Sequence, residues 1–222
     1  MLKEYVIITA GGIGKRMVSD IPKQFMDLNG LPVILHTIKA FADYSSNISF
    51  VLVLPQDSMD DWATVEEKLP QNIAYIVCPG GETRFDSVKK GLAMIDGDGM
   101  VAIHDAARPL LSVSLISDCF LLAAQKGNAI PVITLQDSMR EISGDESRPV
   151  DRDKLRLVQT PQVFELGLIK KAYEQAFRTS FTDDATVAEA FGAKINLLDG
   201  EKKNIKITSP EDMLIAKAYL AE

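Results

Sequence analysis

A run of glycines followed by two cations is the first part of the sequence whose residue types could do chemistry. The apolar residues 5–9 lead directly into Ala10-Gly11-Gly12-Ile13-Gly14-Lys15-Arg16-Met17. Glycines placed after a strand let the backbone approach an anion, whose charge the exposed N–H groups satisfy. A tight turn alone needs one or two glycines and no Lys-Arg pair after them. We therefore interpret residues 10–17 as a phosphate-binding loop.

Two familiar phosphate-binding motifs do not fit this loop. The dinucleotide fingerprint G-x-G-x-x-G needs a third glycine at the place of Met17, and the apolar run 49–54 is followed by Pro55-Gln56 rather than by an acidic residue for a ribose. A Walker A loop needs glycine where the chain has Thr9, and Ser or Thr where it has Arg16. The spacing therefore disfavours a nicotinamide enzyme and a Walker-type site.

Lys23 is a further candidate cation. It follows Pro22, which presets the backbone, and it comes seven residues after Arg16. A lysine after a proline in a loop is usually a solvated surface charge. Beside a glycine loop, however, its ammonium is also suited to hold the phosphorus group that is transferred.

A second glycine loop follows the apolar run 74–77. It reads Gly80-Gly81-Glu82-Thr83-Arg84 and leads into Ser87 and a helix that extends through Leu92. The simplest interpretation is a turn with a helix cap. The functional interpretation is a loop at the same sheet edge that recognises a base or ribose through backbone groups and the Ser87 hydroxyl.

Asp105 stands at the end of the apolar run 100–104, in His104-Asp105-Ala106-Ala107-Arg108-Pro109. An aspartate at a carboxyl strand end suits a Mg²⁺ ligand. An ion pair with Arg108 that shapes the turn is an equally good interpretation of that arginine. We interpret His104 as a structural imidazole rather than as a general base.

The elements that must position these residues alternate along the chain. Buried strands are expected at 5–9, 49–54, 74–77, 100–104, 129–133 and 195–198, because these runs are almost wholly apolar. Helical spacing is found at 34–41, 62–69 and 112–126, with Gly127 as the C′ residue, and Ser209-Pro210 begins a last helix. This order predicts an α/β fold with a Rossmann-like, mostly parallel sheet and helices on both faces.

One stretch departs from this order. More than half of the residues between 137 and 156 are charged, against 25% for the chain, so this stretch cannot be core. A flexible surface loop is one interpretation. The other is a protruding β-hairpin arm, at about 136–157, that pairs with another subunit.

Composition narrows the class of protein. The chain has 222 residues, 46% of them hydrophobic, and a formal net charge of −7, so one globular domain over 1–222 is expected and duplex nucleic acid is a poor partner. Cys78 and Cys119 lack metal-site spacing and are expected as free core thiols in a reducing compartment. No apolar run approaches the roughly 20 residues of a membrane span. These features predict a cytoplasmic protein without a membrane partner.

The motifs occur together in the order of a known family. Their residues are 10–17, 22–24, 80–88, 104–109, Thr160-Pro161-Gln162-Val163-Phe164, Thr182-Asp183-Asp184-Ala185 and 204–212. In these blocks, which extend over nearly the whole chain, the sequence resembles the 2-C-methyl-D-erythritol 4-phosphate cytidylyltransferases of non-mevalonate isoprenoid biosynthesis. Two positions depart from the family, with Gly11 where alanine is common and Ser138 where threonine is usual; both keep the backbone or hydroxyl chemistry.

The resemblance implies a cytidylyl transfer from CTP to 2-C-methyl-D-erythritol 4-phosphate, with Mg²⁺, in a homodimer joined by the arm. A phosphate monoester has a second pKa of about 6, so the attacking oxygen needs no general base. Because the Gly-Gly form of the first loop also resembles ribitol-5-phosphate cytidylyltransferases, ribitol 5-phosphate stays an alternative acceptor. A non-catalytic nucleotide-binding protein is the alternative of a different class.

The resemblance also assigns roles to matching residues. Arg16 and Lys23 are expected to stabilise charge on the α-phosphate, Asp105 to bind the metal, and Arg152 and Lys206 to position the sugar phosphate. The nucleotide contacts that we expect are Ala10, Gly11, Gly12, Gly14, Gly80, Glu82, Ser87, Ala106 and Arg108. The acceptor contacts that we expect are Ser138, Arg152 and Thr182.

Overall fold

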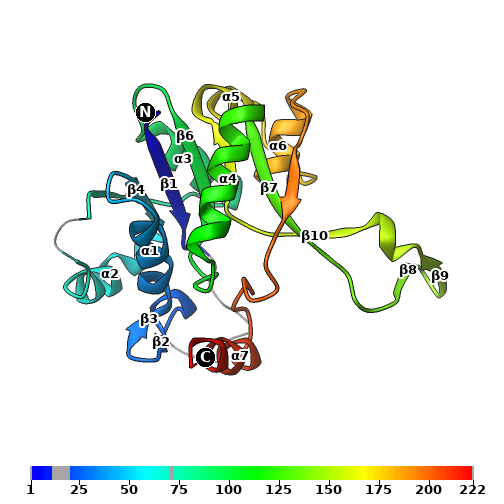
Figure 1. Cartoon of the computed structure of the whole chain (residues 1–222), viewed down its shortest axis with the longest axis horizontal. Helices are drawn as coiled ribbons and strands as arrows, with labels where there is room; N and C mark the ends of the chain where they lie inside the picture. The colour runs from blue at the N-terminus through cyan, green and yellow to red at the C-terminus, as the bar shows by residue number, and fades with distance from the viewer. Residues whose placement is uncertain (1, 12–20, 71–72, 222) are drawn as a thin grey trace.

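A central sheet lies at the middle of the protein in the computed structural model, which describes residues 2–11, 21–70 and 73–221 (Figure 1). Its strands are ordered β10-β7-β11-β6-β1-β4-β5, and β12 also pairs with β7. The strands are β1 Glu4–Thr9, β4 Ser49–Leu54, β5 Tyr75–Pro79, β6 Met100–Asp105, β7 Asn128–Thr134, β10 Arg156–Val158, β11 Gln162–Glu165 and β12 Leu197–Asp199. All six strands expected from apolar runs are present, within two residues at each end.

The sheet is mixed rather than wholly parallel. β1 pairs in parallel with β4 and β6, β4 pairs in parallel with β5, and β12 pairs in parallel with β7. β11 is antiparallel to both β6 and β7, and β10 is antiparallel to β7. The predicted α/β fold is confirmed, and its parallel part, from β6 to β5, contains the strand ends that carry the candidate site.

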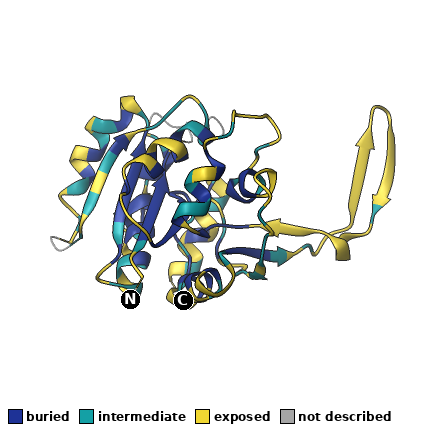
Figure 2. Ribbon diagram, turned by 90° about the horizontal axis from the view of Figure 1, so that it is seen from above, coloured by how far each residue is buried: buried dark blue, intermediate teal, exposed yellow. Residues whose placement is uncertain are grey.

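Helices cover both faces of the sheet because side chains of the strands alternate. On β1, Val6 and Ile8 pack in one cluster with α1 Val33–Tyr44, α2 Met59–Glu66 and α4 Val113–Lys126. Ile7 faces the opposite side, in a cluster with α3 Arg84–Ala93, α5 Leu166–Ala172 and α6 Asp184–Ala190. The strands at the centre of the sheet, β1, β4 and β6, are accordingly buried (Figure 2).

The last helix, α7 Pro210–Leu220, begins as the sequence predicts. Ser209 caps it, and the Asp212 side chain accepts from the backbone N–H of Ser209 in return. Met213 of α7 packs with Leu28 and Ile207 beside the short strands β2 Asp27–Leu28 and β3 Leu31–Pro32. Ile207 also donates its N–H to Ala107 O at 2.8 Å. The segment before α7 is thereby fixed next to the carboxyl end of β6.

A hairpin projects from the sheet as an arm, as the charged stretch predicts. It consists of β8 Met139–Ser143 and β9 Glu146–Val150, followed by the single turn η3 Arg152–Lys154, and it extends away from the sheet in both views (Figures 1 and 2). Every residue of β8 is exposed. The packing that stabilises the sheet does not extend to this hairpin.

Two further expectations concern the thiols and the membrane. Cys78 and Cys119 are buried and form no disulfide, as predicted. None of the helices among the described residues has the length and apolar character that crossing a membrane requires.

Candidate active site

A cavity of about 210 Å³ opens at the carboxyl ends of β1 and β6. In a parallel sheet this edge is where ligands bind. We call it the first cavity; its lining residues are Thr9, Ala10, Gly11, Lys23, Gln24, Gly81, Glu82, Thr83, Arg84, Ser87, Asp105, Ala106, Ala107 and Lys206. Ala10 and Gly11 of the first loop therefore meet residues 81–84 of the second at one place.

The first loop enters this cavity through Ala10 and Gly11. The Ala10 N–H donates to Val53 O at 2.9 Å, which continues the β1–β4 pairing to the end of the strand. A Cβ on Gly11 would lie 3.8 Å from Ser87 Oγ, an ordinary contact. Gly12, Gly14 and Arg16 lie outside the described residues.

Lys23 and Gln24 reach the first cavity from the short turn η1 Lys23–Phe25. Lys23 is buried, although an ammonium normally stays in water. The Gln24 side chain is 2% exposed, and neither atom of its amide has a hydrogen-bond partner in the described part of the chain. Buried polar groups are nearly always paired, so the Gln24 amide is an exception among the residues next to this cavity.

The second glycine loop is fixed by hydrogen bonds at the start of α3. The Ser87 hydroxyl donates to Thr83 O at 2.9 Å and accepts from Gly81 N at 3.0 Å. A Cβ on Gly81 would come within 2.2 Å of the Asp86 Cβ, so only glycine fits there. Gly80 lies behind the cavity wall, with Ser87 Oγ 3.0 Å from where its Cβ would be. Glu82 lines the cavity beside them.

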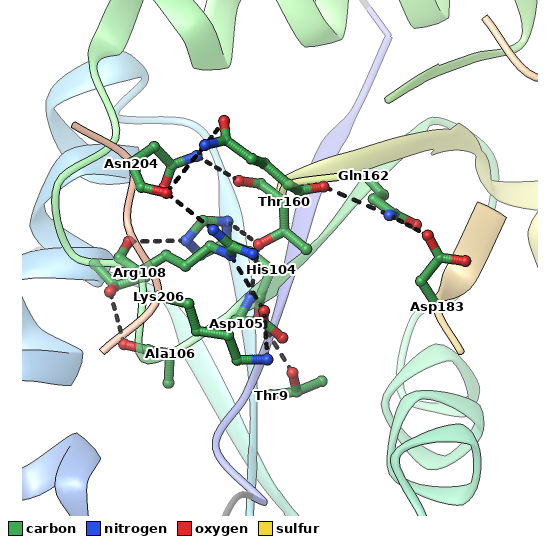
Figure 3. Close-up of polar contacts among 12 residues, drawn as sticks. Thr9, His104, Asp105, Ala106, Arg108, Thr160, Gln162, Asp183, Asn204 and Lys206 are labelled. Atoms are coloured by element: carbon green, nitrogen blue, oxygen red, sulfur yellow. Dashed lines mark hydrogen bonds and ion pairs between the residues drawn. The ribbon is translucent and has the colours of Figure 1, made fainter. Parts of the chain in front are cut away.

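Asp105 is surrounded by three cations. Its Oδ2 lies 2.9 Å from Lys206 Nζ and 3.3 Å from Arg108 Nε (Figure 3). Its Oδ1 lies 3.7 Å from Arg84 Nε. Burial by itself raises the pKa of this carboxyl, but the charges of Arg84, Lys206 and Arg108 outweigh that effect and hold the pKa below its ordinary value. Asp105 is therefore ionised at neutral pH.

Arg84 is anchored on its other side by a buried carboxylate. Its guanidinium makes two hydrogen bonds to Asp184, of 2.8 and 2.6 Å, and the Tyr173 hydroxyl donates to the same carboxylate at 2.6 Å. Burial lowers the pKa of Arg84, but the charge of Asp184 raises it by more, so the pKa lies above its ordinary value. This bidentate pair fixes the direction of the guanidinium at the cavity wall.

A second cavity, of about 270 Å³, adjoins the first. The two share Arg84, Asp105 and Lys206 as lining residues, and the second is also lined by Arg108, Val158, Gln159, Thr160, Gln162, Thr182 and Asp183. Arg108 is not turned to the first cavity: besides Asp105 it bonds Asn204 O at 2.9 Å. Two ligands in these cavities would meet at a wall made of one carboxylate and two cations.

His104 is fully buried next to Asp105 and has no access to either cavity. Its burial lowers the pKa of the imidazole to about 4, so the ring is neutral at pH 7. This agrees with a structural imidazole and not with a general base.

The predicted residues therefore fall into three groups. Lys23, Asp105 and Lys206 lie around the first cavity, with Glu82, Ser87 and Ala106, whereas Thr182 and Arg108 line the second. Ser138 and Arg152 lie on the exposed arm, where the Arg152 guanidinium donates to Gln136 O. They reach neither cavity of their own chain.

Sequence reasoning left out Gln24, Arg84 and Thr160 as functional residues. Gln24 and Arg84 lie inside motifs that were singled out because of neighbouring residues. Nothing in their spacing distinguishes a residue that lines a cavity from one at the surface. Arg84 acquires its place from Asp184, a residue far along the chain. That pairing could have been suggested only by the fold.

Comparisons with known proteins agree with this geometry. The family model of IspD, 2-C-methyl-D-erythritol 4-phosphate cytidylyltransferase, matches residues 5–222. The chain is 45% identical over 219 residues to the 2-C-methyl-D-erythritol 4-phosphate cytidylyltransferase of Bacteroides thetaiotaomicron, which covers 99% of this chain and 100% of that protein.

Two solved structures share the fold over the whole chain. One is the 4-diphosphocytidyl-2C-methyl-D-erythritol synthase of Anaerococcus prevotii, with a TM-score of 0.83, 30% identity, and coverage of 100% of this chain and 97% of that one. The other is the 2-C-methyl-D-erythritol 4-phosphate cytidylyltransferase of Thermus thermophilus, with a TM-score of 0.80, 30% identity, and coverage of 100% and 99%. From sequence and fold together, the chain belongs to the 2-C-methyl-D-erythritol 4-phosphate cytidylyltransferase family of isoprenoid biosynthesis and is a cytidylyltransferase.

Proposed function

We propose that this chain, as one nucleotidyltransferase domain over residues 1–222, transfers the cytidylyl group of CTP to 2-C-methyl-D-erythritol 4-phosphate. The products are 4-diphosphocytidyl-2-C-methyl-D-erythritol and pyrophosphate. The observation that carries the proposal is the pair of adjoining cavities with Arg84, Asp105 and Lys206 in their common wall. CTP occupies the first cavity and the sugar-alcohol phosphate the second, so that the two reacting phosphates meet where the cavities adjoin, next to these three shared residues.

The first cavity suits a nucleotide. Ala10 and Gly11 bring backbone close to a ligand, and the second glycine loop with Ser87 offers small, polar groups on the opposite side. Lys23 supplies a buried positive charge for the α-phosphate, and Arg16 adds a second from the first loop.

The second cavity suits a phosphorylated polyol. Arg108 and Lys206 offer positive charge, while Thr182, Asp183 and Gln162 offer hydrogen-bonding groups for hydroxyls. The attacking oxygen belongs to a phosphate that is ionised at neutral pH, so it attacks the α-phosphorus in line while the pyrophosphate oxygen leaves on the other side. The main obstacle is repulsion between anions, and the cations reduce it.

Asp105 is the residue that would hold a divalent cation, with substrate phosphates as its other ligands. Mg²⁺ at such sites is held by one or two carboxylates together with substrate phosphates. Among the described residues no group of three or more His, Cys, Asp or Glu side chains could hold a metal. Asp105 is a single ionised carboxylate whose Oδ1 has Arg84 Nε no closer than 3.7 Å, while Oδ2 contacts Lys206 and Arg108. When bound there with CTP, Mg²⁺ would neutralise phosphate charge.

The arm, about 136–157, completes the acceptor site of a second copy. A two-stranded hairpin alone is marginally stable in water, and this one exposes Met139 and Ile142. These features support a homodimer joined by the arm. Arg152 and Ser138 would then contact the acceptor bound to the neighbouring subunit, since they reach no cavity of their own chain.

A cytoplasmic location is supported by the two thiols. Cys78 and Cys119 are buried, free and unpaired with each other, which is typical of proteins made in a reducing compartment.

A pyrophosphate-release assay tests the proposed reaction. Purified protein is supplied with CTP and Mg²⁺, and with 2-C-methyl-D-erythritol 4-phosphate, ribitol 5-phosphate or no acceptor in parallel. We expect multiple turnovers only with methylerythritol phosphate. Faster release with ribitol phosphate would overturn the choice of acceptor, and CTP binding without release under any condition would leave a nucleotide-binding protein.

A further inference from the structure

Arg84 and Asp184 connect the two parts of the chain that line the two cavities. Arg84 is the first residue of α3 and directly follows the second glycine loop, which lines the first cavity. Asp184 is the first residue of α6 and directly follows Thr182 and Asp183, which line the second cavity. The hydrogen-bonded pair therefore joins the loop next to the proposed nucleotide to the residues next to the proposed acceptor.

Asp184 lies behind both cavities. The Arg84 side chain is 32% exposed and lines both cavities, whereas the Asp184 side chain has no exposed surface and lines neither. Both carboxylate oxygens accept from the Arg84 guanidinium, and Oδ1 also accepts from the Tyr173 hydroxyl. Burial and the Asp184 charge raise the pKa of Tyr173 well above its ordinary value, so this hydroxyl keeps its hydrogen at neutral pH. Asp184 therefore acts on a ligand from behind, through the residues that it holds.

An aromatic contact holds the same parts of the chain together independently of these charges. Phe85 follows Arg84 and is 5% exposed. Its ring stacks on Tyr173, with 4.7 Å between the ring centroids, and on Phe181, with 5.7 Å. Burial of these rings stabilises the contact whether or not the carboxylate is charged. A variant that neutralises Asp184 should therefore fold, so its effect on the substrates can be measured.

Asp184 also keeps Arg84 from closing onto Asp105. The two terminal nitrogens of Arg84 donate to Asp184 at 2.8 and 2.6 Å, whereas its Nε lies 3.7 Å from Asp105 Oδ1, beyond hydrogen-bond distance. A planar guanidinium that is held through both terminal nitrogens has one orientation. If Asp184 lost its charge, the guanidinium would turn toward the carboxylate of Asp105 and would be less available to phosphates.

We propose that Asp184 is a positioning residue for the proposed cytidylyl transfer. It touches no substrate and holds the Arg84 guanidinium at the junction of the cavities, where the N–H groups that are not bonded to Asp184 are available to the phosphates of both substrates. Through the same pair it fixes the second glycine loop relative to Thr182. Binding of the nucleotide and binding of the acceptor therefore both depend on Asp184. This inference rests on the proposed function of the two cavities.

The first test is Asp184→Asn, which keeps the shape of the side chain but removes its charge and one of its acceptors. We expect kcat/KM to fall by about 10- to 100-fold for both CTP and 2-C-methyl-D-erythritol 4-phosphate, the scale of misplacing a group that orients the reactants. Pyrophosphate release measures kcat/KM for each substrate while the other is saturating. A loss confined to one substrate, or no loss for either, would overturn the proposal.

Glu4→Gln is the matched control. Glu4 accepts from the Tyr44 hydroxyl at 2.9 Å, as Asp184 does from Tyr173, but it lies at the start of β1, at the opposite end of that strand from the cavities. Melting temperatures and activities of folded protein are measured for both variants. We expect Glu4→Gln to keep kcat/KM within about threefold of the wild type, whatever stability it loses. If Asp184 served stability alone, Asp184→Asn would behave in the same way, and that outcome would contradict the proposal.

A double-mutant cycle tests whether Asp184 acts through Arg84. In the Arg84→Ala background, Asp184→Asn should lower kcat/KM by less than about threefold further, because the guanidinium that it positions is already gone. The double variant should also melt at a higher temperature than Arg84→Ala, which leaves a buried carboxylate without its cation. Additive losses of kcat/KM would show that Asp184 acts independently of Arg84 and would contradict the positioning role.

Arg84→Lys decides the question if Asp184→Asn does not fold. Lysine keeps the positive charge but lacks the two-pronged grip on a carboxylate, so Asp184 can no longer orient it. We expect kcat/KM to fall for both substrates, and wild-type values for both would overturn the proposal. Wild-type turnover is measured first. Without it the proposed function fails, whereas losses in the variants alone bear on Asp184.

Discussion

At the scale of single residues, the site is a balance of charge around one carboxylate. Asp105 faces Arg84, Arg108 and Lys206 within 3.7 Å, and Arg84 is itself balanced by Asp184. Paired in this way, buried charges are tolerated, whereas breaking one pair is expensive. The same cations are available to phosphates, so the arrangement that stabilises the Asp105 carboxylate also prepares the site for two anionic substrates.

Lys23 is the described cation that we expect to matter most for the transfer itself. Lys23→Ala should lower kcat by about 10²- to 10³-fold, because a preorganised charge next to the transferring phosphate is lost. Pyrophosphate release at saturating substrates measures this. Lys39→Ala is the control, since Lys39 forms an exposed i,i+4 pair with Asp43 and should change nothing. A Lys23→Ala variant with the wild-type kcat would remove the residue from the mechanism.

At the scale of elements, the junction of β5 and α3 is closely packed around glycine. A Cβ at Gly81 would lie 2.2 Å from the Asp86 Cβ, whereas one at Gly11 would lie 3.8 Å from Ser87 Oγ. We expect Gly81→Ala to displace the start of α3, to lower stability by about 1–3 kcal/mol and to raise KM for CTP. Gly11→Ala should be close to the wild type. Urea unfolding and CTP kinetics compare the two, and equal behaviour would contradict this packing.

Cys119, in α4, makes the unfolding free energy of the protein depend on pH. Burial raises the pKa of its thiol to about 12, with Asp118 and Glu201 adding to the effect. The unfolded thiol ionises near pH 8.5, so above that pH the unfolded state binds fewer protons than the folded state, and stability falls as pH rises. Between pH 8 and 10 the wild type should lose about 1–2 kcal/mol more unfolding free energy than Cys119→Ala. Parallel pH curves for the two proteins would show that the thiol is not buried.

What could be predicted from the sequence follows from how local each signal is. The buried strands β1, β4 and β6 are continuous apolar runs, and the capped ends of α4 and α7 have local signatures, so all are found. β11, α5 and α6 have seven residues or fewer, which is shorter than the roughly 11–18 residues over which helical periodicity is recognised, so they were not predicted. Asp105 could be placed at a strand end, but its clamp by Arg84 and Lys206 depends on residues that only the fold brings together.

At the scale of the whole molecule, the arm is the feature that a single copy leaves unexplained. Its residues are exposed, and the Arg152 side chain bonds only within the arm among the described contacts. In the proposed dimer, each active site combines Lys23 of one subunit, in the nucleotide cavity, with Arg152 of the other, at the acceptor. Because each active site would then take residues from both subunits, the activity of dimers that mix two variants can test the arrangement.

Mixing of inactive subunits tests this arrangement. Lys23→Ala and Arg152→Ala proteins are each expected to be impaired, the second mainly through a higher KM for the acceptor. When the two are coexpressed, mixed dimers contain one site with both substitutions and one with neither. About a quarter of wild-type activity should return, since half of the dimers are mixed. No recovery in dimers shown to be mixed would mean that the arm serves its own chain.

The central claim is that both substrates bind side by side next to Arg84, Asp105 and Lys206. The acceptor phosphate can then attack CTP directly. The most direct measurement is the stereochemical course at the α-phosphorus, with CTP made chiral there by sulfur substitution. A single in-line attack predicts inversion of configuration in the cytidylyl product. Retention would require two displacements through a covalent cytidylyl-enzyme and would contradict the account.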